Sequence, residues 1–110
     1  MRQKVDSRSL STDCGVESSL EVLGGKWKGV IIHHLLNGTK RFNELRRLMP
    51  NVTQRMLTRQ LRELENDGLL WREVYPEVPP RVEYSLTKKG ETLEPIIRLL
   101  KAWGDENLPQ

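Results

Sequence analysis

The chain has 110 residues, of which 36% are hydrophobic and 30% are charged. This length fits one domain, and this balance is typical of a globular chain rather than a disordered one. No apolar run is long enough to span a bilayer, the first residues lack the apolar core of a signal peptide, and the single cysteine, Cys14, excludes an intrachain disulfide. We therefore expect a cytoplasmic protein that makes no membrane contact.

Positive charge is concentrated in the middle of the chain. The formal net charge is +3, but the segment 26–62 holds nine Lys and Arg residues against one acid, Glu44. Such clustering is the usual electrostatic signature of a surface that binds nucleic acid. The ordinary alternative is a set of basic helix faces that contact only solvent.

The first third of the chain predicts a flexible tail and then two helices. Residues 1–12 are polar and rich in serine, which is typical of a loose tail before one folded domain at 13–108. An apolar stripe predicts a helix over about 16–23, and Gly24-Gly25 ends it because glycine readily adopts the left-handed backbone of helix C-termini. A mostly apolar helix over about 27–36 should then be deeply buried.

Two helices separated by a short turn follow. Residues 39–42 could form an extended segment, and a helix is expected over about 43–49 before Pro50 breaks it. Thr53 can cap the next helix, which should run to about residue 66. Two helices joined by about four residues form a helix-turn-helix arrangement.

The second helix of this motif has two different faces. Leu57, Leu61 and Leu64 recur at helical spacing and predict a buried stripe. The opposite face of a helix in this position enters the major groove of DNA. That face carries four polar or basic residues, which are Arg55, Thr58, Arg59 and Arg62.

The remainder of the chain predicts a β-hairpin and a final helix. Residues 69–75 and 81–86 are rich in β-forming residues and flank a proline-rich tip. Thr87 can cap the last helix, although Pro95 would delay or kink its start. After the first helix at about 16–23, three helices, a hairpin and a helix follow in the order of a winged helix-turn-helix domain, which is mainly α with a small β-hairpin.

The residue types on these elements suggest roles in binding double-stranded DNA. Arginine is the commonest reader of guanine, glutamine can pair with adenine, and threonine can contact a thymine methyl. We expect DNA contacts at the start of the second helix from Thr53, Gln54, Arg55, Thr58 and Arg59, and phosphate contacts from Arg62, Lys40, Arg41, Arg46 and Arg47.

The two hairpin arginines have two competing interpretations. Arg72 and Arg81 could reach phosphates or an adjacent minor groove. They could equally pair with the acidic residues Glu73 and Glu83 across the strands of the hairpin.

Three stretches of the chain resemble the HxlR-type family of bacterial winged-helix transcriptional regulators, a family related in fold to the MarR group. They are CGVESSLEVLGGKWKGVII, KRFNELRRLMPNVTQRMLTRQLRELENDGLL and PPRVEYSLTKKGETLEPII, which together extend from Cys14 to about Trp103. The resemblance implies a homodimer that binds a palindromic or pseudo-palindromic operator. A repressor is the expectation, with activation as the alternative that the sequence leaves open.

The resemblance also implies that extra N-terminal and C-terminal helices form the dimer. The last helix has a wide apolar stripe that ends in an aromatic residue, which is more than one small domain needs to cover its core. The alternative is that this stripe packs only within its own domain. The residues expected in the interface are Val16, Leu20, Leu93, Ile96, Ile97, Leu100 and Trp103.

Cys14 matches the position at which members of this family respond to oxidants or electrophiles. It could carry an adduct with a small electrophile or thiol. The start of a helix favours a thiolate there, whereas the carboxylates of Asp13 and Glu17 oppose it. The ordinary alternative is a small apolar side chain packed between helices.

Nothing in the sequence indicates catalysis. His33 and His34 are adjacent, so on a helix they point about 100° apart and suit a shared metal poorly. We expect no enzyme, no cofactor and no metal. The competing function from a different class is a winged-helix module that uses its basic face to bind an acidic partner protein.

Overall fold

The computed structural model describes residues 14–109, so the predicted tail at 1–12 lies outside the described part of the chain. Helices predominate, and the expected helix-turn-helix and hairpin are both present. The elements are α1 (Gly15–Leu23), α2 (Lys28–Leu35), β1 (Lys40–Arg41), α3 (Phe42–Leu48), α4 (Gln54–Asn66), β2 (Leu70–Tyr75), β3 (Arg81–Leu86), α5 (Lys88–Glu91) and α6 (Glu94–Asn107).

Local signals in the sequence set where these elements begin and end. The Thr53 hydroxyl accepts a hydrogen bond from the Met56 N–H at 3.1 Å, which caps α4 as predicted. Gly68 follows α4 with a φ of +76°, a left-handed conformation that residues with a Cβ rarely adopt. Thr87 accepts from the Gly90 N–H at 3.0 Å, which confirms its predicted role as a cap.

The sheet has three strands rather than the predicted two. Its order is β1-β3-β2, and both pairings are antiparallel. The extended segment before α3 joins the sheet as β1, where Lys40 lies opposite Tyr84. This pairing ties the start of the helix-turn-helix to the hairpin, and it joins residues too far apart in the chain for a local pattern to predict.

The sequence predicted a single last helix. This prediction was wrong, because the structure has two helices after the hairpin. The four-residue α5 ends at Glu91, and α6 begins at Glu94 with Pro95 in its first turn. Proline is tolerated there because the N–H groups of a first turn have no partner within the helix.

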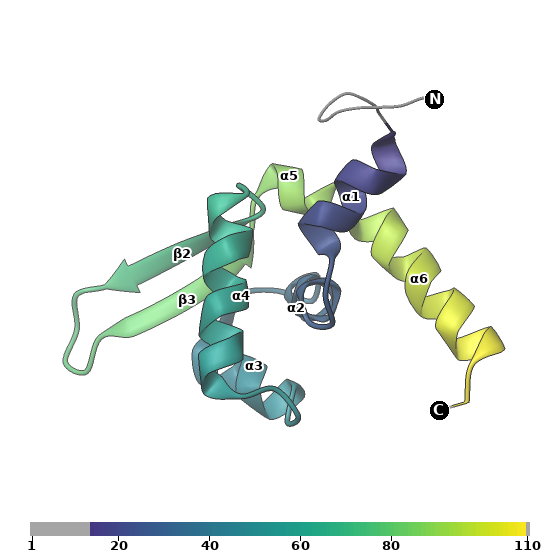
Figure 1. The fold of residues 1–110 in the computed structure, drawn as a ribbon. Coiled ribbons are helices and arrows are strands. Elements are labelled where there is room, and N and C mark those ends of the chain that lie inside the picture. The colour runs from purple at the N-terminus through teal and green to yellow at the C-terminus, as the bar shows by residue number, and fades with distance from the viewer. Residues whose placement is uncertain (1–13, 110) are drawn as a thin grey trace.

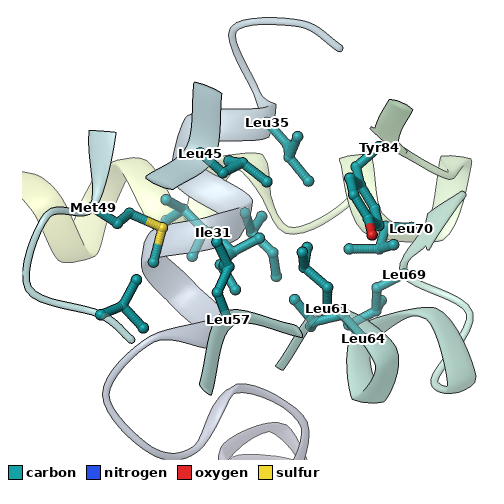
Figure 2. Close-up of a cluster of buried hydrophobic side chains, with 13 residues drawn as sticks. Ile31, Leu35, Leu45, Met49, Leu57, Leu61, Leu64, Leu69, Leu70 and Tyr84 are labelled. Carbon is teal, nitrogen blue, oxygen red and sulfur yellow. The ribbon is translucent and has the colours of Figure 1, made fainter. Parts of the chain in front are cut away.

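The core lies between α2, α3, α4 and the sheet. Figure 2 shows the side chains of these elements meeting in one cluster. Eight side chains of the cluster are less than 2% exposed, namely Ile31, Ile32, Leu45, Leu57, Leu61, Leu64, Leu69 and Leu70. Two parts of the chain project from this body in different directions, the β2–β3 hairpin on one side and α6 on the other (Figure 1). Within residues 14–109, no helix has the length and hydrophobicity needed to cross a bilayer.

Candidate nucleic-acid interface

The second helix of the helix-turn-helix, α4, separates its apolar and basic residues as predicted. Leu57, Leu61 and Leu64 are at most 1% exposed and anchor α4 to the core. The residues expected to contact DNA from this helix are all exposed, namely Thr53, Gln54, Arg55, Thr58, Arg59 and Arg62. One stripe of α4 therefore fixes the helix, which leaves the other free to meet a ligand.

Basic side chains from neighbouring elements flank this helix. Arg46 of α3 donates a hydrogen bond to the Gln54 side chain at 3.4 Å, which links the two helices of the motif. Arg41 and Arg47 are exposed, and Lys40 is half-buried. Within residues 14–109, no ion pair engages Lys40, Arg41, Arg47, Arg55 or Arg62. Their charges are therefore available to an anion.

Two residues that the sequence analysis did not single out, Lys28 and Glu63, lie beside the exposed basic face of α4, which we call the recognition face. The Lys28 ammonium of α2 lies 2.8 Å from Glu63 of α4, and Lys28 is only 9% exposed. Glu63 also pairs with Arg59 at 3.4 Å. The hydrogen bond from Lys28, with a smaller contribution from Arg59, holds the pKa of Glu63 below its ordinary value. The spacing of Arg59 and Glu63 could have predicted their pairing, but nothing local indicated Lys28.

Both hairpin arginines form ion pairs within the chain, but neither forms the cross-strand pair that the sequence suggested. Arg81 lies 3.0 Å from Glu77 and 3.3 Å from Glu83, and its guanidinium stacks 3.9 Å from the centre of the Tyr75 ring. Arg72 pairs at 3.3 Å with Glu65 of α4 instead of with Glu73. These ion pairs hold the hairpin together and connect it to α4, and the DNA contacts expected from Arg72 and Arg81 stay a prediction.

An exposed apolar surface lies away from the basic face. Of the residues expected in a dimer interface, five are exposed, namely Val16, Leu20, Ile96, Leu100 and Trp103. The other two differ. Ile97 is 4% exposed and belongs to the core, and Leu93 packs against that core, so a single chain already accounts for their burial.

A groove of about 900 Å³ opens on this apolar surface between α1, α2 and α6. Its lining includes Val16, Leu20, Ile96 and Leu100. Cys14 also lines it, and this exposed thiol precedes the first residue of α1. The structure thus brings the cysteine and these four residues of the predicted interface to one groove.

The two histidines lie close to each other at the end of α2. Their ring centroids are 5.1 Å apart, and the rings are tilted by 56°. Burial, reinforced by the nearby charges of His33 and Lys40, lowers the pKa of His34 and so favours its neutral form. In the described part of the chain, no group of three or more His, Cys, Asp or Glu residues could hold a metal ion.

Comparisons with known proteins agree with this geometry. A family model described as HxlR-like helix-turn-helix matches residues 22–110. Over 94 residues, the chain is 62% identical to the uncharacterized HTH-type transcriptional regulator YybR of Bacillus subtilis (strain 168), and the match covers 86% of this chain and 75% of YybR. The similarity to YybR therefore extends over most of the length of both proteins.

Two solved structures share the fold. The redox regulator HypR in its oxidized form matches with a TM-score of 0.84 and 60% identity, which covers 88% of this chain and 100% of that chain. The diamide-treated YodB from B. subtilis matches with a TM-score of 0.71 and 39% identity, which covers 91% and 100%. These similarities confirm the predicted winged helix-turn-helix fold.

Proposed function

Because this chain belongs to the HxlR-like helix-turn-helix family and is therefore a transcriptional regulator of the helix-turn-helix type, we propose that it binds double-stranded operator DNA in a sequence-specific manner. One observation carries the proposal. The second helix of the motif exposes arginines on one face and buries leucines on the other. In this class of motif, that exposed face enters the major groove.

The chemistry of each side chain indicates whether it would contact bases or phosphates. Arg55 and Arg59 can each offer a planar fork to the O6 and N7 atoms of guanine, while Gln54 and Thr58 can discriminate among other bases. The cations around α4 would bind phosphates and fix the register of the protein on DNA. The residues in this second role are Arg62, Lys40, Arg41, Arg46 and Arg47.

We further propose that two chains form a homodimer through α1 and α6. No residue of α1 is buried, and Ile97 is the buried residue of α6. Isolated helices this short are marginal in water, so their stability depends on packing an apolar face against something else. A second copy of the same surface would cover Val16, Leu20, Leu100 and Trp103 and close the groove between α1, α2 and α6.

A dimer of this kind would suit an operator with two-fold symmetry and a response to oxidation. Two recognition helices about 34 Å apart match successive turns of the major groove, so half-sites should repeat at that spacing. We infer that binding near a promoter represses transcription. Cys14 is exposed at the start of α1, where its oxidation could alter how the two copies pack. The structural similarity to HypR, which is described as a redox regulator, supports this part of the proposal.

The test is selection of bound fragments from the host genome by the full-length chain, followed by fluorescence anisotropy on the selected duplex and on a scrambled duplex. We expect a clear preference for the selected duplex, with affinity that falls steeply as salt rises because phosphate contacts release counterions. Equal binding to both duplexes would contradict the proposal and favour the protein-interaction module.

A further inference from the structure

We propose that Glu63 is a positioning residue for DNA recognition, which holds the Arg59 guanidinium in place because Lys28 of α2 anchors its carboxylate. This inference rests on the proposed role of Arg59 as a base reader. The two oxygens of Glu63 serve different partners. Oε1 lies 2.8 Å from the Lys28 ammonium, and Oε2 lies 3.4 Å from Nε of Arg59.

Lys28 makes this arrangement different from an ordinary surface pair. An exposed pair between residues four apart on a helix is weak, and its side chains move freely. Lys28, however, is 9% exposed and comes from a neighbouring core helix. If the Glu63 carboxylate moved away, the Lys28 charge would lose its partner in a mostly buried site, which is unfavourable. The carboxylate is therefore tied to the core and can act as a fixed acceptor for Arg59.

The geometry leaves Arg59 able to read a base. Only its Nε is engaged by Glu63, and the side chain of Arg59 is 69% exposed. An arginine has five N–H donors, so the two terminal nitrogens remain for O6 and N7 of guanine. A side chain that is already ordered loses less freedom when it binds DNA. Arg55 lies on the same face and has no ion pair within residues 14–109, so it serves as an internal comparison.

Because Glu63 carries a negative charge, a purely electrostatic effect and a positioning effect predict different changes in DNA binding. A carboxylate beside the recognition face repels phosphate, so its removal should tighten the binding of every DNA sequence if charge were its only effect. Loss of Lys28 should weaken the binding of every sequence for the same reason. A positioning role predicts something else, namely that both changes reduce the preference for operator over scrambled DNA.

The experiment measures anisotropy of the selected operator duplex and of a scrambled duplex with the full-length chain. Glu63→Gln and Lys28→Met change the net charge in opposite directions, yet each should lower the ratio of operator to scrambled affinity about three- to tenfold. Asp67→Asn, directly after the same helix, is the matched control, because the Asp67 side chain is exposed and no ion pair engages it within residues 14–109. It removes the same charge without touching Arg59 and should leave the ratio unchanged, even if both affinities shift.

Repeating Glu63→Gln in an Arg59→Ala background separates the two levels of the proposal. We expect no further loss of the ratio there, because Glu63 acts through Arg59. A loss of equal size in both backgrounds would overturn the positioning role while leaving Arg59 as a reader. An unchanged ratio in Arg59→Ala alone would overturn both proposals. Circular dichroism of each variant confirms that it is folded, and Lys28→Met provides the test if Glu63→Gln fails to fold.

Discussion

Gly90 lies directly against the main-chain carbonyl oxygen of Leu69. A Cβ at position 90 would overlap that oxygen and come within 3.2 Å of Cδ2 of Leu86. The same carbonyl accepts a hydrogen bond from the Thr87 N–H at 3.1 Å. Through these contacts the short helix α5 is pressed onto the base of the hairpin, and α6 leaves the domain in a fixed direction.

Gly90→Ala should therefore destabilise the fold. The backbone at Leu69 cannot move aside without disturbing β2, so we expect the free energy of unfolding to fall by about 1–3 kcal/mol, as for other overpacked sites. Urea denaturation measures this change. Gly29→Ala in α2 is the control, because its Cβ would meet only Cδ1 of Ile97 at 3.9 Å. That variant should be neutral or more stable by up to about 1 kcal/mol, and an equal loss from both variants would contradict the packing explanation.

The Lys28–Glu63 ion pair should make stability depend on pH. Lys28 and Arg59 lower the pKa of Glu63 in the folded state, so the folded chain holds the Glu63 proton less tightly than the unfolded chain does. The contribution to stability is fully present above the unfolded pKa of about 4.5, and it is lost as pH falls through the lower folded value.

The measurement is urea denaturation of the wild type and Glu63→Gln between pH 7 and pH 3. The wild type should be more stable at pH 7, and the difference should shrink as the solution becomes acidic. Glu91→Gln is the control, since Glu91 is exposed and makes no ion pair in the described range. A difference between wild type and Glu63→Gln that stays constant over this pH range would show that the pair does not contribute in the folded protein.

Arg55 and Arg47 should affect DNA binding in different ways. Arg55→Ala should weaken operator binding by about 1–3 kcal/mol and relax base preference at one position, because a bidentate contact to guanine would be lost. Arg47→Ala should weaken the binding of all duplexes similarly and reduce the slope of log affinity against log salt by about one unit. Both are read by anisotropy over a salt series. Identical, sequence-independent losses would remove the assignment of Arg55 to base reading.

The exposed apolar side of α6 should be required for dimer formation. Leu100 and Trp103 are 60% and 58% exposed in a single chain. Changing both to glutamine should give a monomer in sedimentation, with weak binding to an operator that has two half-sites. Val74 and Val78 on the hairpin are also exposed, and the same change there should leave the mass unaltered. A wild type that sediments as a monomer at micromolar concentration would contradict the homodimer.

Cys14 should make operator binding sensitive to thiol oxidants. When diamide takes up two electrons and two protons from two Cys14 thiols, it is reduced to the hydrazine and an S–S bond forms between the subunits. With an added small thiol, the product is a mixed disulfide at Cys14 instead. Either product lies at the start of α1, so we expect diamide to lower operator affinity.

Cys14→Ser is the decisive variant for this response. It should bind the operator as tightly as the reduced wild type, and diamide should leave its affinity unchanged, as measured by anisotropy and by non-reducing gel electrophoresis. If the same dose of diamide releases Cys14→Ser from DNA, Cys14 is not the sensor.

Some features of this protein were predictable from the sequence because they depend on residues close together along the chain. The leucines of α4 recur at the period of a helix, so the helix and its buried face could be predicted without the rest of the fold. Thr53 and Thr87 cap helices through N–H groups three residues away, which is also a local relationship. The helix-turn-helix and the exposed arginines of its second helix follow from such patterns.

Other features were decided by tertiary structure, because periodicity does not state which distant side chains will meet. Lys28 appeared to add to the basic surface, but packing of α2 against α4 brings it to Glu63 and removes its charge from solvent. Arg81 is enclosed by acidic residues and the Tyr75 ring once the hairpin closes. The apolar stripe of α6 did not by itself indicate which of its residues would be buried in the core and which would be exposed. Only the position of the helix against α2 buries Ile97 and leaves Trp103 exposed, since burial depends on what lies opposite each side chain.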